Sequence, residues 1–319
     1  MRRTGKGTGR QWLALLLGLV ISLVAARLPA DEVAGTLGAV GSDTLAGLML
    51  RWGEQLAEHH PGVRLQLQAS GSASAPPALT AGTTRLGPMS RPMYEAERDA
   101  FEARHGYPPV ELALARDALV VIVHRHNPLD GLSPAELDAI FSDTRRCGAE
   151  APIDRWSQLG VELPGDRIVL HGRNVASGTH DLFRQQALCG GSFRLRLNEH
   201  PGSAATVAAV AAEPSAIGYA GLNHLTPSVK AVKRRDAEGE LQAPTPEAVR
   251  SSDYPLSRTL YLYVNLPPGG GLPGPERAFL EQVFSAEGQS VVEELGFVTL
   301  PEARLERQRR WLEALPSAE

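Results

Sequence analysis

The stretch ALARDALVVIVH at residues 113–124 carries the longest apolar strand signal in the chain. Around it, strand-like segments such as Val63–Gln68 alternate with helix-like segments, which is the pattern of an α/β protein. We expect residues 113–124 to form a strand that runs from one lobe of such a protein into another. A second apolar strand at 216–220 is expected to return the chain to the first lobe.

Helices are predicted between these strands. A helix after residue 44 is indicated by apolar residues that recur at the spacing of one buried face, namely Leu45, Leu48, Met49, Trp52 and Leu56. Ser133-Pro134 opens another helix, with a capping serine and a proline at the first helical position. Two further helices, at 276–295 and 302–315, are expected to close the chain.

The composition is that of an ordinary globular protein. Of the 319 residues, 43% are apolar and 21% are charged, with 32 Lys and Arg against 36 Asp and Glu. This balance excludes a disordered, collagenous or coiled-coil chain. The formal net charge of −4 also argues against nucleic acid as a partner, because that function needs a concentrated basic surface.

The first thirty residues have the pattern of a secretory signal peptide. Basic residues precede an uncharged apolar stretch from Trp12 to Ala26, which is short for a bilayer span. Leu28-Pro29-Ala30 then offers a cleavage site before Asp31. An uncleaved membrane anchor is the alternative. Removal of residues 1–30 leaves 27 basic residues against 36 acidic ones, so the exported chain carries a net charge of −9.

The chain has two cysteines, Cys147 and Cys189. Export places them in an oxidising compartment, where we expect them to form a disulfide. Closing a loop of about forty residues contributes on the order of 4 kcal/mol in the chain-entropy model. Two separate buried thiols are the alternative.

Three strand-to-helix turns share a composition of glycine and small hydroxyl residues. They are Gly41-Ser42-Asp43-Thr44, Ser70-Gly71-Ser72-Ala73-Ser74 and Ala176-Ser177-Gly178-Thr179, the last of which follows Arg173. Each lies at an expected helix N-terminus, where unpaired N–H groups and the helix dipole favour oxyanions. Hydroxyl groups add donors, and glycine allows the backbone to approach a ligand closely. One such turn is accounted for as a helix cap, whereas three together indicate an anion site.

Six segments resemble, in order along the chain, the phosphate-binding proteins of ABC transporters, the PstS type. They are GSDTL at 41–45, GSASAPPAL at 71–79, LGPMSRPM at 86–93, DALVVIVH at 117–124, GRNVASGTHDLF at 172–183 and AIGYAG at 216–221. The similarity runs from about residue 35 to about residue 300. It implies a two-lobed α/β periplasmic binding protein of a type II-like fold, which holds phosphate in the cleft between its lobes and requires no cofactor.

The resemblance assigns phosphate contacts to both lobes. In the first lobe, Ser42 and Thr44 match the first phosphate-contacting turn, and Ser72 matches the serine of the second. In the second lobe the matching residues are Arg173, Ser177, Gly178 and Thr179. An arginine suits a tetrahedral oxyanion because its planar fork donates two hydrogen bonds at fixed geometry.

The third turn departs from the family pattern. Well-studied members carry there an aspartate that accepts a proton from hydrogen phosphate, which lets them reject fully ionised sulfate. This chain has Ser90-Arg91 instead, and both residues are candidate ligand contacts. Asp43, in the first turn, is the acidic residue that can replace the missing acceptor. The alternative is that Asp43 caps a helix.

The resemblance also implies a domain organisation and partners. Lobe 1 is expected to comprise residues 31–116 and 216–319, and lobe 2 residues 117–215, which include both cysteines. The implied function is a periplasmic, monomeric protein that captures inorganic phosphate for ABC permease subunits without catalysis. The alternatives are a phosphate-sensing or envelope-interaction protein on the same fold, a binder of another tetrahedral oxyanion, and a secreted phosphatase or esterase. The last would need a metal cluster or an activated nucleophile.

Overall fold

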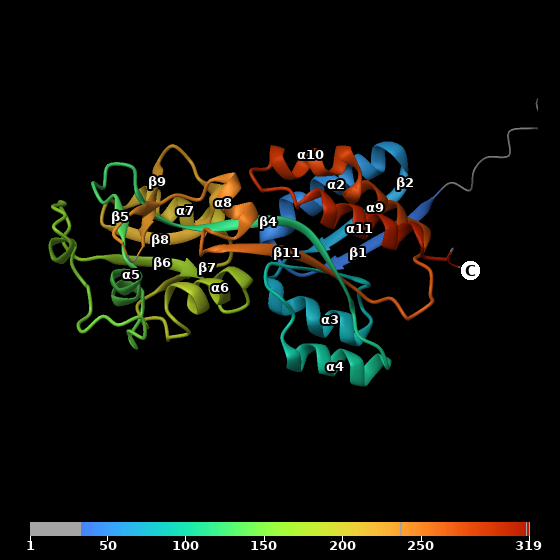
Figure 1. The fold of residues 1–319 in the computed structure, drawn as a ribbon, viewed down its shortest axis with the longest axis horizontal. Helices are drawn as coiled ribbons and strands as arrows, with labels where there is room; N and C mark the ends of the chain where they lie inside the picture. The colour runs from blue at the N-terminus through green and yellow to red at the C-terminus, as the bar shows by residue number, and fades with distance from the viewer. Residues whose placement is uncertain (1–32, 237, 317, 319) are drawn as a thin grey trace, which may run out of the picture. The chain divides into compact units, whose positions relative to one another are not determined.

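A computed structural model describes residues 33–236, 238–316 and 318. The predicted signal peptide at 1–30 lies outside these residues. From Ala34 onward the chain packs as one unit, in which two lobes of helices and strands are joined by long strands (Figure 1). Within the described part of the chain, no helix has both the length and the apolar character required to cross a membrane.

The main sheet has the strand order β2-β1-β3-β11-β4-β8-β6-β7. In lobe 1, β1 (Ala34–Val40) runs parallel to β2 (Gly62–Gln68) and β3 (Leu86–Met89), and β11 (Ser257–Val264) pairs antiparallel with β3. In lobe 2, β6 (Val169–Arg173) runs parallel to β7 (Asn198–His200) and β8 (Ala216–Gly221). β9 (Val229–Arg235) pairs with β4, β5 (Gly131–Leu132) and β10 (Leu241–Gln242).

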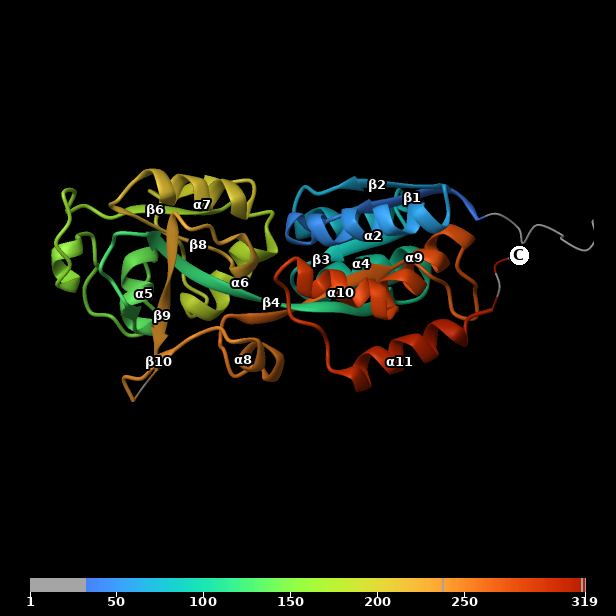
Figure 2. The same ribbon diagram turned by 90° about the horizontal axis from the view of Figure 1, so that it is seen from above.

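Helices cover both faces of the lobe 1 sheet. α3 (Ala75–Ala81) and α4 (Glu95–His105) lie on one face, and α2 (Ala46–His59), α9 (Gly274–Phe284) and α10 (Ala286–Glu294) lie on the other (Figures 1 and 2). The apolar face predicted for α2 is confirmed, because all five of its residues are buried. α11 (Glu302–Glu313) packs against α9, and its buried Gln308 side chain bonds both the N–H and the C=O of Ala113.

Lobe 2 is built in the same way around its own core. α7 (Ser203–Ala212) lies on one face of β6 and β8, whereas α5 (Pro134–Phe141) and α6 (Gly178–Ala187) lie on the other (Figure 1). α8 (Pro246–Ser251) packs near β4. The expected disulfide is confirmed, because Cys147 and Cys189 are bonded across a separation of 42 residues.

The apolar stretch at residues 113–124 forms most of β4 (Val110–His124), which connects the lobes as expected. Residues 110–118 of this strand pair with β11 in lobe 1, and residues 119–124 pair with β8 and β9 in lobe 2. Its side chains are almost continuously buried, which accounts for a sequence that is apolar without alternation.

The strand at 216–220 does not return to lobe 1. It is β8, which lies between β4 and β6 in the sheet of lobe 2. A short run of small apolar residues is typical of a strand buried on both faces. Such a strand can belong to either lobe, so the sequence pattern does not show which lobe contains residues 216–220. The chain returns through β11, which pairs with both β4 and β3. From this pairing we propose that lobe 2 comprises residues 117–256 rather than 117–215.

The single helix expected at 276–295 is two helices, α9 and α10, divided at Ser285. Ser285 ends α9, and its Oγ accepts the N–H of Gly288 at 2.9 Å to cap α10. A Cβ on Gly288 would lie 1.9 Å from the carbonyl oxygen of Gln282, so only glycine fits this sharp turn. The Gly288 carbonyl in turn accepts the indole N–H of Trp52 at 2.7 Å.

Candidate functional site

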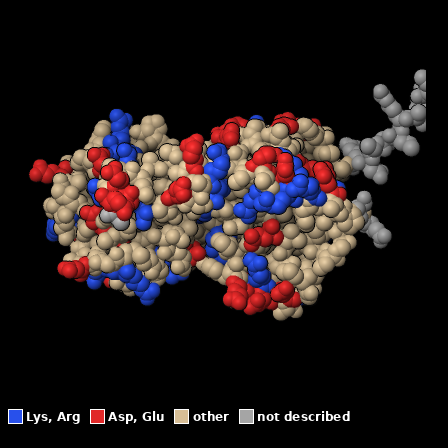
Figure 3. Space-filling view, viewed as in Figure 1, with Lys and Arg blue, Asp and Glu red and all other residues tan. Residues whose placement is uncertain are grey.

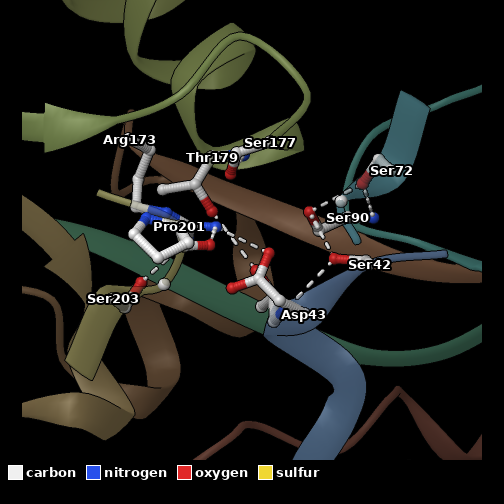
Figure 4. Close-up of polar contacts among 12 residues, drawn as sticks. Ser42, Asp43, Ser72, Ser90, Arg173, Ser177, Thr179, Pro201 and Ser203 are labelled. Atoms are coloured by element: carbon white, nitrogen blue, oxygen red, sulfur yellow. Dashed lines mark hydrogen bonds and ion pairs between the residues drawn. The ribbon is translucent and has the colours of Figure 1, made fainter. Parts of the chain in front are cut away.

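Three serines of lobe 1 converge at the carboxyl ends of its parallel strands, where ligand sites of open α/β sheets lie. Ser42 follows β1, Ser72 follows β2 and Ser90 follows β3, and all three are buried. Ser42 Oγ donates to Ser90 Oγ at 3.0 Å, and Ser72 Oγ lies 3.1 Å from Ser90 Oγ (Figure 4). Gly41 is required before the first serine, because a Cβ there would lie 2.0 Å from the Pro88 carbonyl oxygen.

Lobe 2 meets these serines with the first turn of α6. Thr179 Oγ1 lies 3.2 Å from Thr44 Oγ1 across the lobes. Gly178 packs so closely that a Cβ added to it would lie 2.6 Å from the hydroxyl oxygens of both Ser72 and Ser90. The lobes are therefore in direct contact at the predicted anion-binding turns. Ser177 caps α6, since its Oγ accepts the Thr179 N–H at 3.1 Å.

Arg173, the last residue of β6, is completely buried. Its Nη2 donates to Asp43 Oδ1 at 2.7 Å, which joins the two lobes, and to the Pro201 carbonyl oxygen at 2.8 Å. Nε and Nη1 donate to the His200 carbonyl oxygen and to Ser203 Oγ, both at 3.3 Å. Figure 4 shows the Asp43 carboxylate pointing toward this guanidinium. Each guanidinium nitrogen of Arg173 thus has an acceptor, and Asp43 connects the group to the first turn of lobe 1.

A second buried arginine completes the site and was not predicted from the sequence. Arg258 of β11 and Asp117 of β4 are directly opposite each other in the antiparallel pair. Arg258 Nε and Nη2 donate to Asp117 Oδ2 at 2.9 and 2.6 Å. Arg258 Nη2 also contacts hydroxyl oxygens from both lobes, Thr179 Oγ1 at 3.0 Å and Thr44 Oγ1 at 3.4 Å. The signal was a charged residue inside each of two apolar strands. Asp117 opens the DALVVIVH segment without being singled out there, and Arg258 lies in none of the six segments.

The structure does not bring Arg91 into this cluster. Its guanidinium makes two bonds of 2.7 Å to the carboxylate of Glu97 and lies 3.9 Å from the ring centroid of Tyr94. Successive side chains of extended backbone point to opposite sides. Ser90 therefore faces the hydroxyl cluster, and Arg91 faces α4.

Asp43 is not the helix cap that was considered as an alternative. Ser42 takes that role, because its Oγ accepts the N–H of Thr44 at 3.2 Å. The Asp43 carboxylate binds Arg173 through Oδ1, and its Oδ2 accepts no hydrogen bond from the residues that the structure describes. This geometry leaves an acceptor oxygen available, so proton acceptance by Asp43 stays a prediction.

Burial shifts the protonation equilibria of the side chains around the arginines. Tyr219 Oη accepts the backbone N–H of Arg173 at 3.1 Å, and burial raises the pKa of this phenol. Burial lowers the pKa of His200, and the charge of Arg173 lowers it further. Burial also lowers the pKa of His224, against the opposing effect of the Asp117 and Asp43 carboxylates. The histidines therefore stay neutral near pH 7, and the positive charge of the site comes from the arginines.

The assembled cluster presents hydrogen-bond donors from two lobes in a buried setting. The Arg258 guanidinium contacts hydroxyls of both lobes, the Arg173 guanidinium contacts Ser203 Oγ and Asp43, and the α6 N-terminus adds its helix dipole. Such a set suits a tetrahedral oxyanion, because fork-shaped and single donors together can reach oxygens pointing in several directions.

Comparison with known proteins agrees with this geometry. Residues 29–287 match the family model described as a PBP superfamily domain. The chain is 46% identical over 277 residues to the phosphate-binding protein PstS of Pseudomonas aeruginosa, with 85% of each chain covered. A phosphate-bound structure from Clostridium perfringens, assigned to the phosphate ABC transporter substrate-binding proteins, has a TM-score of 0.71 at 23% identity and covers 84% of this chain and 100% of that one.

A second solved structure has the same fold. The ABC-type phosphate transport receptor of Vibrio cholerae matches with a TM-score of 0.65 at 20% identity, covering 82% of this chain and 99% of that one. The expected two-lobed α/β fold is thus confirmed. On the family model and the Pseudomonas relative together, the chain belongs to the PBP superfamily and, within it, to the PstS family of phosphate-binding proteins.

Proposed function

We propose that this protein captures inorganic phosphate reversibly between its lobes, without catalysis, and delivers it to the permease of an ABC transporter. The observation that carries the proposal is a pair of buried guanidinium groups at the meeting of the lobes: Arg258 contacts hydroxyls of both lobes, and Arg173 reaches Asp43 across them. The name of the Pseudomonas relative and the phosphate bound in the Clostridium structure support phosphate as the anion.

Binding is coupled to movement of the lobes. Thr179 lies 3.2 Å from Thr44 across the lobes, and Gly178 packs against the hydroxyls of Ser72 and Ser90, so an anion reaches these groups only when the lobes separate. On closure each hydroxyl exchanges a neutral partner for an anion oxygen, which is roughly twice as strong a hydrogen bond. Exclusion of water from the closed site strengthens these bonds further. Besides the two arginines, the proposed phosphate contacts are Ser42, Thr44, Ser72, Ser90, Thr179 and the backbone of Gly178.

Calorimetric titration with phosphate, sulfate and molybdate tests the anion. We expect heat of binding with phosphate and much weaker binding of the other two. Absence of heat with all three would overturn the proposal, and a preference for molybdate or sulfate would reassign the anion. No turnover of a generic phosphate ester is expected, because the site holds its charged groups for binding. Steady hydrolysis would favour the esterase alternative.

Asp43 is the proposed acceptor for the proton of hydrogen phosphate. Arg173 holds the carboxylate in place through Oδ1, which leaves Oδ2 to accept from a protonated anion oxygen and to repel an unprotonated one. Asp43→Asn is expected to narrow the ratio of phosphate to sulfate affinity at least tenfold. The matched control is Asp99→Asn, which changes an exposed carboxylate in α4. Unchanged discrimination in Asp43→Asn would reject Asp43 as the acceptor.

We infer periplasmic localisation from the predicted signal peptide together with the disulfide of lobe 2. N-terminal sequencing of the exported protein is expected to begin at Asp31. A protein that retains Trp12–Ala26 and sediments with membranes would instead be an anchored form.

A further inference from the structure

Lobe 2 contains a cavity of about 500 Å³ that is separate from the interlobe site. Its charged lining consists of four arginines and two aspartates, namely Arg155, Arg167, Arg194, Arg196, Asp143 and Asp154. None of these six residues belongs to the interlobe cluster. A volume in the roughly 300–1,000 Å³ range is typical of sites for small molecules and is larger than a single orthophosphate requires.

Two of the arginines face each other without a shared acceptor. Arg155 and Arg167 are directly opposite in an isolated antiparallel bridge, a position in which like charges destabilise the pair. Arg155 has one carboxylate contact, to Asp166 at 3.3 Å, and Arg167 has no acceptor among the described residues. Both side chains are exposed, so most of their N–H groups are free to bind a ligand.

The other two arginines form the inner wall. Arg194 and Arg196 both donate to the same oxygen, Asp154 Oδ1. Arg194 is only 7% exposed, and its Nε has no partner among the described residues. Burial lowers the pKa of Arg196, and the charges of Arg194 and Arg167 lower it further against the opposing effect of Asp154. Counting Asp166 with the lining, the four guanidinium groups still exceed the carboxylates.

We propose that this cavity binds a soluble anion that carries two or more phosphoryl groups, such as a short polyphosphate. An arginine fork binds a phosphoryl group bidentately. The forks of Arg194 and Arg196 are held by Asp154 and by the carbonyl oxygens of Ala139 and Ile168, so they contribute charge, whereas the two exposed forks of Arg155 and Arg167 are the ones that can each bind a phosphoryl group. The apolar contribution is a single exposed side chain, that of Leu195. One leucine is too small a surface for insertion into a lipid layer, which favours a soluble anion over a membrane.

The test is calorimetric titration of the mature chain with tripolyphosphate at about 150 mM salt, where screening suppresses weak surface binding. Saturating orthophosphate in the cell occupies the interlobe site, so the experiment does not depend on the function proposed for that site. We expect tripolyphosphate to bind under these conditions. The double variant Arg155→Ala/Arg167→Ala is expected to bind at least tenfold more weakly, and it removes only exposed side chains.

The matched control is Arg307→Ala/Arg310→Ala, which removes the same charge from the exposed face of α11. Its tripolyphosphate affinity is expected to equal that of the unaltered protein. The proposal is overturned if tripolyphosphate gives no heat, if both double variants weaken binding equally, or if orthophosphate abolishes the binding. Flotation with phosphatidylglycerol vesicles that depends on Arg155 and Arg167, without tripolyphosphate binding, would reassign the cavity to a lipid headgroup.

Discussion

Arg258→Lys keeps the positive charge at the centre of the interlobe site but removes its planar fork. Arg258 donates twice to Asp117 and once, at 3.2 Å, to the Ser90 carbonyl oxygen. One ammonium nitrogen cannot occupy all of these positions. Loss of about two charge-assisted hydrogen bonds, at roughly 1.5 kcal/mol each, lowers the free energy of unfolding by about 3 kcal/mol. Arg258→Ala leaves Asp117 buried without a counter-charge and is expected to lower the free energy of unfolding by about 3–5 kcal/mol.

Urea unfolding, followed by the fluorescence of the buried Trp52 and Trp156, measures this loss. Arg51→Lys is the control, because Arg51 makes a partly exposed pair with Glu54 in α2 that is worth about 1 kcal/mol or less. Calorimetry should also show phosphate binding at least tenfold weaker in Arg258→Lys, since an anion contact of about 1.4 kcal/mol or more is lost. Stability and phosphate affinity equal to those of the unaltered protein would refute the role assigned to Arg258.

Gly178→Ala is expected to weaken phosphate binding at least tenfold with little change in stability, because its Cβ would meet lobe 1 hydroxyls at 2.6 Å and hold the lobes apart. Small-angle scattering of this variant should show no compaction when phosphate is added. Gly47→Ala in α2 is the control and should bind phosphate and compact like the unaltered protein. Burial lowers the pKa of His180 to about 4, so between pH 7 and pH 5 the imidazole takes up a proton in the unfolded chain but not in the folded one. The free energy of unfolding should therefore fall by about 1–2 kcal/mol over this range, after allowance for partial exposure. A urea midpoint that stays constant or rises on acidification would contradict this. Reduction of the Cys147–Cys189 disulfide should lower the free energy of unfolding by on the order of 4 kcal/mol, and an unchanged midpoint in dithiothreitol would show that lobe 2 does not depend on it.

The anion-binding turns of the site could be predicted because each turn is formed by residues that are consecutive in the sequence. Ser42, Ser72 and Ser177 each follow a strand and precede a helix, so glycine and hydroxyl residues at these points indicate a cap or an anion site. Ser42 and Ser72 converge because parallel strands of lobe 1 end on the same side of the sheet, whereas the turn of Ser177 comes from lobe 2. Ser90 was included through family resemblance, and the structure places it at the centre of the three serines.

The contacts that depend on long-range pairing could not be predicted. Asp117 and Arg258 meet only because β4 and β11 are in a particular antiparallel register, and a sequence without its pairing partner does not reveal register. The structure places Arg91 outside the hydroxyl cluster for a related reason. Arg91 directly follows Ser90 in the chain, but its guanidinium binds both carboxylate oxygens of Glu97 in α4 at 2.7 Å and therefore points away from the site.

Recognition at the interlobe site has to be local, because the exported chain as a whole repels anions. With a predicted net charge of −9, its long-range field opposes phosphate, although salt screens that field over about 8 Å. On the face shown in Figure 3, acidic and basic side chains are intermixed, with no broad positive patch to attract an anion. Within the site, Arg173 and Arg258 are each neutralised by a carboxylate, Asp43 and Asp117. The selectivity for a tetrahedral anion must therefore come from the directions of buried N–H and O–H donors rather than from surplus charge, and this makes the exact closure of the two lobes the determinant of affinity.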